Sequence, residues 1–338
     1  MKNNNRQSIF PPLRDNFNRT ISYIRLALTD RCNLRCTYCM PAEGIGFIPH
    51  EKILTYEELS KLSSVFVQAG IRKIRITGGE PFVRKGVMNF ITHLKQNIKV
   101  PELHITTNGV ETYKYVSELA ELGISGINLS LDTLNPDRFV EMTRRNSFNH
   151  VMRSIKLMLE YGIPLKINCV VQSGKNTDEL TKIAALAREN PIQVRFIEEM
   201  PFNGKRSFNQ EKNLINAEQI LQILSQEYPS IAPEPLQKGT AKIYQIDGFK
   251  GTIGIIGGYS RSFCGSCNRL RITSTGIIKT CLYDNGAFNL KEFLQDKPND
   301  AEIYHYLSDI IKNRYRNGFE AEKASFAECK QSMAMIGG

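Results

Sequence analysis

Six short β-rich runs alternate with amphipathic helical stretches over residues 20–200, and this alternation restricts the chain to few folds. The predicted strands cover residues 23–28, 73–77, 103–107, 126–131, 165–171 and 192–197. Helical periodicity lies between them at 56–69, 86–97, 112–122, 136–160 and 178–189. Strands that alternate with helices pair in parallel through right-handed crossovers. The sequence therefore predicts an α/β fold, a (β/α) barrel or an open doubly wound sheet, with function at the carboxyl ends of the strands.

Some element boundaries have a local cause. Thr55, with Glu58 three residues later, matches the capping box that begins a helix. Gly70, Gly123 and Gly162 stand where helices should end, because glycine enters the left-handed cap at little cost.

The alternation stops after the sixth predicted strand. A helix is expected near 217–227, and residues 242–246 and 252–256 flank Asp247-Gly248, which is typical of a hairpin turn. A second, smaller unit is therefore expected to begin between residues 201 and 240.

The charge of the chain points to an anionic partner. The 338 residues carry a formal net charge of +10, which favours nucleic acid, an anionic membrane surface or a phosphorylated small molecule. No run of five basic residues occurs and Trp is absent, which disfavours a dedicated nucleic-acid binder. The polar N-terminus lacks a secretory signal, and no 18-residue apolar stretch occurs. We expect a cytoplasmic protein with no membrane partner.

Three cysteines follow the first predicted strand at the spacing C-x3-C-x2-C: Cys32, Cys36 and Cys39. Thiolates are the ligands that iron–sulfur clusters need. Three of them on one loop can hold three irons of a cubane and leave the fourth iron open to a small molecule. The alternative is a zinc site, which usually needs a fourth Cys or His nearby. The nearest candidate, His50, is eleven residues beyond Cys39.

A second triad, Cys264, Cys267 and Cys281, has the spacing C-x2-C-x13-C and again no obvious fourth ligand. Alone it is compatible with a zinc knuckle. Paired with the first triad, it favours a second open cluster. Cys169 lies in an apolar strand and is expected to be a packed thiol, whereas Cys329 has no assigned role.

The first triad, with Tyr38 one position before its last cysteine, resembles the signature of radical S-adenosylmethionine (SAM) enzymes. The whole chain from about residue 20 resembles one family among them, the GTP 3′,8-cyclases of molybdenum cofactor biosynthesis. The matching segments are TDRCN (29–33), IRITGGEPFVR (74–84), TTNG (106–109), NLSLD (128–132), KIN (166–168), RFIEEM (195–200), FCGSCNRLR (263–271) and the C-terminal Gly337-Gly338.

The resemblance implies a fold and a division of the chain. The expected fold is an incomplete (β/α)6 barrel of the TIM type, followed by a smaller C-terminal domain that carries the second iron–sulfur cluster. We expect a flexible N-terminal arm over 1–19, the radical SAM partial barrel over 20–215, and the C-terminal domain with the Gly-Gly tail over 216–338.

The resemblance also assigns residues. Cys32, Cys36 and Cys39 would bind one [4Fe-4S] cluster, and Cys264, Cys267 and Cys281 the other. The positions implied for SAM are Tyr38, Gly79, Ser130 and Met200, and Glu80 could accept from its amino group. Those implied for GTP are Arg25, Arg75, Thr106, Lys166, Arg269 and Arg271. Catalytic positions are Gly337, Gly338 and Arg195. Cations on separate strands can point into one barrel lumen, where a triphosphate would offset their charge.

The implied activity is that of a lyase. A 5′-deoxyadenosyl radical abstracts H3′ of GTP, C3′ attacks C8, and the product is (8S)-3′,8-cyclo-7,8-dihydroguanosine 5′-triphosphate. The implied partners are a flavodoxin- or ferredoxin-type reductant and cyclic pyranopterin monophosphate synthase, the next enzyme; a homodimer is left open. The alternatives are another radical SAM enzyme with an auxiliary cluster, such as a peptide-modifying one, a zinc-stabilised RNA-binding protein, and a ferredoxin-like electron-transfer domain.

Overall fold

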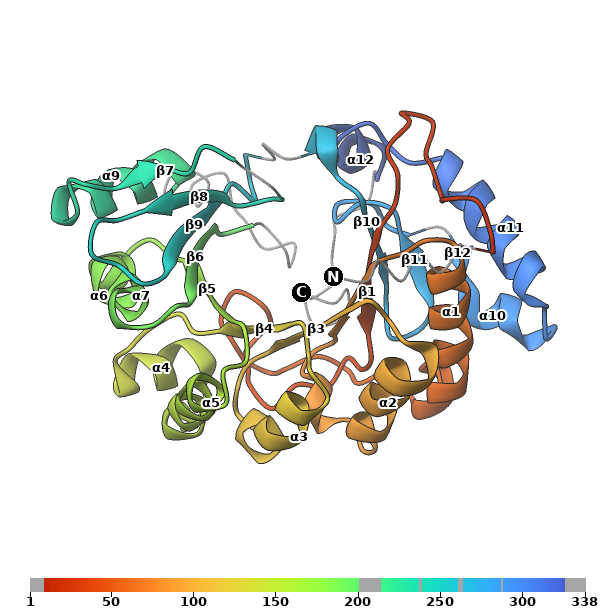
Figure 1. The fold of residues 1–338 in the computed structure, drawn as a ribbon, viewed down its shortest axis with the longest axis horizontal. Helices are drawn as coiled ribbons and strands as arrows, with labels where there is room; N and C mark the ends of the chain where they lie inside the picture. The colour runs from red at the N-terminus through yellow and green to blue at the C-terminus, as the bar shows by residue number, and fades with distance from the viewer. Residues whose placement is uncertain (1–8, 201–213, 237–238, 261–263, 287, 326–338) are drawn as a thin grey trace, which may run out of the picture.

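One curved sheet organises the molecule (Figure 1). The computed structural model describes residues 9–200, 214–236, 239–260, 264–286 and 288–325. The six predicted strands are present and pair in parallel in chain order. They are β1 (Tyr23–Ala27), β2 (Lys73–Thr77), β3 (Glu102–Thr107), β4 (Gly126–Ser130), β5 (Leu165–Val171) and β6 (Gln193–Glu198). The helices lie on the outer side of the sheet, as in a partial barrel.

The helices of this half begin and end largely where the sequence predicts. They are α1 (Tyr56–Gln68), α2 (Val87–His93), α3 (Val116–Glu121), α4 (Pro136–Thr143), α5 (Phe148–Glu160), α6 (Leu180–Ala184) and α7 (Leu186–Glu189). Thr55 and Glu58 form the predicted capping box. Gly70, Gly123 and Gly162 have positive φ, which confirms them as left-handed helix ends.

The single helix predicted over 136–160 is wrong, because the chain forms α4 and α5 with a break between them. Arg144 caps α4 in the left-handed conformation at φ 56°, which a residue with a Cβ adopts only at a cost. The helical pattern continues through the break, so hydrophobic periodicity does not reveal it. The hydrogen bonds that Arg144 donates to the carbonyls of Arg35 and Met40 compensate for the strain.

The C-terminal half extends the same sheet at both edges. The strand β9 (Thr252–Ile256) pairs in parallel with β6, and β10 (Arg269–Ile272) pairs in parallel with β1. Eight neighbouring strands are therefore parallel, in the order β10-β1-β2-β3-β4-β5-β6-β9. The predicted hairpin is confirmed, because β8 (Lys242–Gln245) pairs antiparallel with β9.

The remaining elements complete the two edges. They are β7 (Ala232–Pro233), β11 (Ile277–Lys279), β12 (Phe288–Asn289), α9 (Ala217–Glu227), α10 (Leu290–Gln295), α11 (Asp300–Lys312) and α12 (Gly318–Ala324). The helix expected near 217–227 is α9. Because strands of both halves share one sheet, the division proposed near residue 215 has no counterpart in the hydrogen-bond ladder, and the boundary stays a prediction.

The N-terminal segment from residue 9 onward is packed rather than free. Leu13 is 1% exposed, and Phe10 stacks on Tyr304 of α11 at 4.6 Å between ring centroids. Arg14 and Thr20 form an isolated antiparallel bridge. The described part of the arm expected to be flexible is therefore anchored on the C-terminal half; residues 1–8 lie outside the described residues.

Strand alternation separates the core from the lumen of the barrel. Along β5, Leu165, Ile167, Cys169 and Val171 are buried, whereas the residues between them are partly exposed. Cys169 is 0% exposed, which confirms the packed thiol. Side chains of successive strand residues point to opposite faces, so Lys166 faces the side opposite the helices. No described helix is long and apolar enough to span a bilayer.

Glu198, at the end of β6, joins the two halves of the sheet. It is 2% exposed and accepts hydrogen bonds from the backbone nitrogens of Ala217 (2.8 Å), Tyr259 (2.9 Å) and Ser260 (2.8 Å).

Glu198→Ala leaves these donors without the carboxylate, and we expect the free energy of unfolding to fall by about 3 kcal/mol. Urea denaturation checks this, with Glu189→Ala, an exposed carboxylate on α7, as the matched control. Equal effects of the two substitutions would contradict the role.

Candidate functional site

The first cysteine triad lies on the loop that follows β1, at the carboxyl end of the strand. Its three thiols are close enough for Cys32 and Cys39 to influence the pKa of Cys36, which burial raises. The Cys32 sulfur accepts from Leu34 N at 3.4 Å and from Asn108 Nδ2 at 3.6 Å. Donors directed at sulfur are a feature of cluster-binding cysteines.

In the part of the chain that the structure describes, no three His, Cys, Asp or Glu side chains converge on a single metal-ion position. The fit of this loop to a cluster therefore rests on its set of three thiols and two sulfur-directed donors. Burial raises the pKa of Cys32 to about 12, so a bound metal would have to displace its proton.

The C-terminal end of α4 holds this loop, which explains the break at Arg144. The last carbonyls of α4, on Thr143 and Met142, accept from Arg35 N and Thr37 N, both at 2.9 Å. Arg144 Nη1 donates to the carbonyls of Arg35 (2.8 Å) and Met40 (3.0 Å), on either side of Cys36 and Cys39. One guanidinium thus bridges two points of the loop.

The Gly78-Gly79 turn after β2 packs directly on the same loop. A Cβ on Gly79 would lie 2.3 Å from the carbonyl oxygen of Arg31, and Gly78 has φ +149°. Gly79 N donates to Thr29 O at 2.7 Å, and Glu80 N donates to Arg31 O at 2.8 Å. The missing side chains therefore allow two loop backbones to meet, while the predicted SAM contact of Gly79 stays a prediction.

Glu80 is fully buried next to this turn. Its oxygens accept from Phe82 N, Thr107 Oγ1 and Asn108 N, at 3.1, 2.9 and 2.7 Å. Burial raises its pKa to about 7 even though these donors favour the carboxylate. Glu80 thus connects β2 to β3, and its suggested contact with an amino group stays a prediction.

Tyr38 reaches from the loop to β4. Its hydroxyl hydrogen bonds to Asp132, whose Oδ1 accepts from Val170 N at 2.8 Å. Ser130 ends β4, and Met200 follows β6 beside Gly258. Three predicted SAM positions therefore lie at the carboxyl ends of strands or on the loop beyond β1, although their role stays a prediction.

Cations gather on the inner face of the sheet. Arg271, Arg25 and Arg75 are register partners across β10, β1 and β2. Burial, with the charges of Arg271, Arg75 and Arg269, lowers the pKa of Arg25 to about 9. Arg75 also donates to Thr106 Oγ1 at 3.3 Å.

The opposite strands contribute two more cations. Burial, together with Arg195, Lys73 and Arg75, lowers the pKa of Lys166 to about 8. Burial and the charge of Arg75 likewise lower the pKa of Arg195, to about 10. The structure therefore brings together the cations predicted for GTP and Arg195, and their charges lower one another's pKa.

The sequence interpretation missed Tyr23, Lys73 and His104 in this group. Arg75 Nε donates to the Tyr23 hydroxyl at 2.7 Å, and Lys73 lies over the Tyr23 ring at 5.3 Å. Burial raises the pKa of Tyr23, but the charges of Arg75, Arg25, Arg269 and Lys73 outweigh it and lower the value to about 7. Tyr23 and Lys73 stand two residues before Arg25 and Arg75, so strand alternation could have found both.

The second triad lies beside the cation group. Cys267 and Cys281 raise the pKa of Arg271, and burial with Arg269 lowers it more strongly. Arg314, 6% exposed, donates to Cys267 O and Thr280 O at 3.1 Å and to Cys267 Sγ at 3.6 Å. Arg19 donates to Cys264 O at 3.2 Å. Arg314 carried no sequence signal, and Cys329, Gly337 and Gly338 lie outside the described residues.

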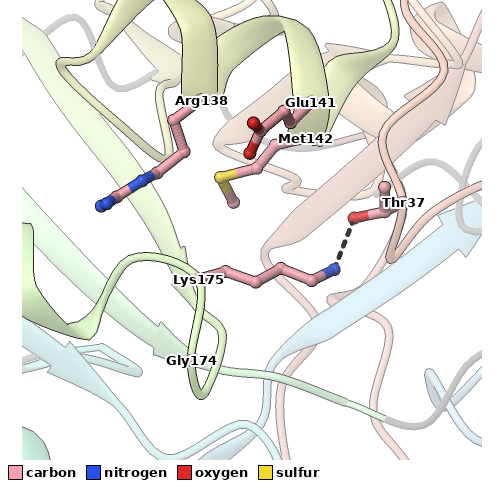
Figure 2. A pocket seen from close by; sticks show the side chains of 6 residues that line it. All are labelled: Thr37, Arg138, Glu141, Met142, Gly174 and Lys175. Carbon is pink, nitrogen blue, oxygen red and sulfur yellow. Dashed lines mark hydrogen bonds between the residues drawn. The ribbon is translucent and has the colours of Figure 1, made fainter.

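A pocket of about 290 Å³ adjoins the first cysteine loop at Thr37 (Figure 2). It is lined by Thr37, Arg138, Glu141, Met142, Gly174 and Lys175. Lys175 extends across it and donates to Thr37 Oγ1 at 3.0 Å. The pocket thus lies between the first cysteine loop, α4 and the segment that follows β5.

Solved structures share this fold. The crystal structure of SuiB from Streptococcus suis has a TM-score of 0.62 at 15% identity, covering 87% of this chain and 69% of that one. The structure of anSMEcpe with bound AdoMet has a TM-score of 0.60 at 16% identity. That match covers 93% of this chain and 87% of the other. A family model described as Radical SAM superfamily matches residues 26–187. The partial barrel is confirmed, and its class is the radical SAM superfamily.

The C-terminal half and the curated relatives narrow this class. A family model described as Molybdenum Cofactor Synthesis C matches residues 192–319. The GTP 3′,8-cyclase of Desulforamulus reducens is 42% identical, covering 89% of this chain and 93% of that protein. The GTP 3′,8-cyclase of Petrotoga mobilis is 38% identical, and the match covers 96% of this chain and 99% of that protein. The chain belongs to the GTP 3′,8-cyclase family.

Other relatives are longer. Molybdenum cofactor biosynthesis protein 1 of Drosophila melanogaster is 42% identical over 89% of this chain, and the human protein is 40% identical over 90%. The chain spans about half the length of these relatives, 52% and 48%. Family membership excludes the zinc-stabilised RNA-binding protein and the isolated electron-transfer domain as descriptions of the chain.

The bridge made by Arg144 yields a prediction that needs no bound cofactor. Arg144→Gly keeps the left-handed backbone conformation but removes both guanidinium hydrogen bonds to the loop. In the metal-free chain we expect maleimide to modify Cys32, Cys36 and Cys39 about tenfold faster, as resolved by peptide mass spectrometry. Buried Cys169 is the internal control and should stay protected. An unchanged rate at the three loop thiols would show that Arg144 does not hold the loop.

Proposed function

We propose that the chain is a radical SAM GTP 3′,8-cyclase that converts GTP to (8S)-3′,8-cyclo-7,8-dihydroguanosine 5′-triphosphate. The observation that carries the proposal is the cation group between β10 and β6, which adjoins the second cysteine triad. Family membership supports the same activity. The lyase class is part of this proposal.

The substrate follows from the charges. Buried cations that repel one another are stable together when an anion compensates them, and guanidinium groups match phosphate oxygens in pairs. Arg25, Arg75, Lys166, Arg269 and Arg271 would bind the triphosphate, with Thr106 as a neutral donor. Tyr23 and Lys73 extend the same surface.

The cofactors follow from the thiols. Cys32, Cys36 and Cys39 would hold one [4Fe-4S] cluster, and Cys264, Cys267 and Cys281 the other. Tyr38, Gly79, Ser130 and Met200 would hold SAM beside the first cluster, which would supply the electron for the reductive cleavage that begins radical chemistry. The bonds from Leu34 and Asn108 to Cys32, and from Arg314 to Cys267, hold the sulfurs in place.

The chain's own contribution is positioning. Arg269 and Arg271 lie two and four residues beyond Cys267, so the nucleotide would be held close to the second triad. Fixing C3′ and C8 in contact geometry lowers the entropic cost of ring closure. Arg195, Gly337 and Gly338 are proposed as catalytic residues at this site.

Family membership also supports a proposal for the partners and the location of the enzyme. The reductant is a flavodoxin- or ferredoxin-type protein, and cyclic pyranopterin monophosphate synthase takes the product. We propose a cytoplasmic location, no nucleic-acid or membrane partner, and a homodimer as an open possibility for sedimentation analysis.

Anaerobic incubation tests the activity directly. The reconstituted chain is mixed with dithionite, SAM and each of the four nucleoside triphosphates in separate reactions. Cyclised product from GTP alone supports the proposal. SAM cleavage without a cyclised nucleotide in any reaction would refute it and point to another radical SAM enzyme with an auxiliary cluster.

The two triads have separate roles in this proposal. Cys36→Ala should abolish SAM cleavage, because it removes a ligand of the cluster that binds SAM. Cys267→Ala should retain abortive cleavage while cyclised product falls at least a hundredfold, since substrate positioning is lost. Chromatographic quantification of 5′-deoxyadenosine and product checks both, with Cys169→Ser as the control. Equal loss of both products in the two variants would contradict separate roles.

The low pKa of Lys166 gives a pH dependence. A triphosphate favours the charged amine, so binding raises this pKa from about 8 and takes up a proton. The Lys166 contribution is complete below pH 8 and is lost as pH rises above it, at up to about tenfold in affinity per pH unit. Calorimetry at pH 7.5 and 9 measures this.

Lys166→Arg stays charged over this range and should flatten part of the pH dependence. Lys156→Arg, on the exposed face of α5, is the control, because its side chain is 77% exposed. A pH dependence in Lys166→Arg equal to that of the unchanged chain would exclude Lys166 as its source.

A further inference from the structure

The proposed function requires one electron from outside the chain for each SAM cleaved, so a surface near the first cysteine loop must receive a donor. The loop and the segments beside it carry exposed side chains that are not among the proposed SAM and GTP positions, Arg31 and Phe47 among them. A role for these side chains in reduction rests on the proposed function.

Phe47 and two arginines form a patch on the loop itself. Arg31 and Arg35 lie over the Phe47 ring at 5.4 and 5.6 Å from its centroid, and Phe47 is 45% exposed. Arg35 Nη1 donates to the carbonyls of Cys32 (2.6 Å) and Leu34 (2.9 Å). The patch is therefore connected by hydrogen bonds to a proposed cluster ligand.

Among the described residues, the position next to Phe47 in sequence has room around it. A Cβ added to Gly46 would meet no atom within 4 Å. The loop that carries Phe47 is nevertheless fixed, because Ile48 N donates to Asp30 Oδ2 at 2.7 Å. An exposed aromatic ring on a fixed backbone, flanked by arginines, has the composition of an interface hot spot.

Arginines outnumber exposed carboxylates on the loop and at the end of α4, where Glu43 and Glu141 are the exposed acidic residues. Arg31, Arg35, Arg144 and Arg145 form no ion pair with a carboxylate in the ranges that the structure describes. Lys175 adds a further cation at the pocket beside the loop, which Arg138 and Glu141 also line (Figure 2). Unpaired surface cations attract an acidic protein and accelerate its association.

We propose that Arg31, Phe47, Arg145 and Lys175 form the docking surface for a small acidic electron-transfer protein that reduces the first cluster. One electron leaves the reduced cofactor of the donor and enters the cluster held by Cys32, Cys36 and Cys39. The donor is oxidised by one electron, and no atom is transferred. Phe47 is the apolar anchor, and the cations set orientation and association rate.

Two reductants separate docking from catalysis. Phe47→Ala and Arg145→Glu are combined in one variant, and turnover is measured with dithionite and with a flavodoxin, its reductase and NADPH. Dithionite is small and does not need the patch, so turnover with it should stay within about twofold. Turnover at limiting flavodoxin should fall about tenfold or more, because charge reversal slows association. Raising the salt concentration should slow the flavodoxin reaction of the unchanged chain and affect the variant less.

A control variant combines Tyr161→Ala and Arg72→Glu. Tyr161 is 50% exposed at the end of α5, and Arg72 is exposed just before β2, so both lie at the amino ends of the parallel strands. This variant should behave as the unchanged chain with either reductant. Equal flavodoxin turnover in the two variants would overturn the proposal, as would a parallel loss with dithionite.

Failure of the proposed function can be told apart from failure of the docking proposal. Reduction of the first cluster by flavodoxin is followed by the loss of visible absorbance in the Cys267→Ala background, without GTP. If the unchanged chain makes no cyclised product but the Phe47 and Arg145 substitutions still slow this reduction, the docking proposal is supported and the proposed activity is refuted. If the substitutions leave the reduction unaffected, the docking proposal is refuted whether or not cyclised product forms.

Discussion

Mutual repulsion among cations inside the barrel is the constraint on which the site depends. Four of these cations come from separate strands: Arg25, Arg75, Lys166 and Arg195. The charge of Arg75 contributes to lowering the pKa of each of the other three. The register of the parallel strands brings them together. A bound anion would offset such a cost, and the proposed triphosphate substrate would supply that charge.

The same sheet explains how two remote cysteine triads can serve one lumen. The first follows β1, and the second precedes and follows β10, which pairs with β1 in parallel. Arg25 and Arg271 are direct register partners in that pairing. The proposed auxiliary cluster site is therefore coupled to the start of the barrel by a ladder of backbone hydrogen bonds, and not by side chains alone.

Local patterns predicted the features that depend on neighbours in sequence. The six strands, the capping box at Thr55 and the hairpin at Asp247-Gly248 needed only periodicity and turn chemistry. The break at Arg144 could not be predicted, because it depends on the carbonyls of Arg35 and Met40, more than a hundred residues away. Arg314 escaped notice for the same reason, since its partners Asp15 and Cys267 are remote.

The contact between Arg314 and Asp15, at 3.1 Å, has a consequence for biosynthesis. These residues are separated by 299 positions, and the guanidinium also holds the backbone of Cys267. A ribosome must therefore translate nearly the whole described chain before this contact can form, whereas Cys32, Cys36 and Cys39 meet β1 and α4 much earlier. The backbone around Cys267 is accordingly fixed only after residues from both ends of the described chain have come together.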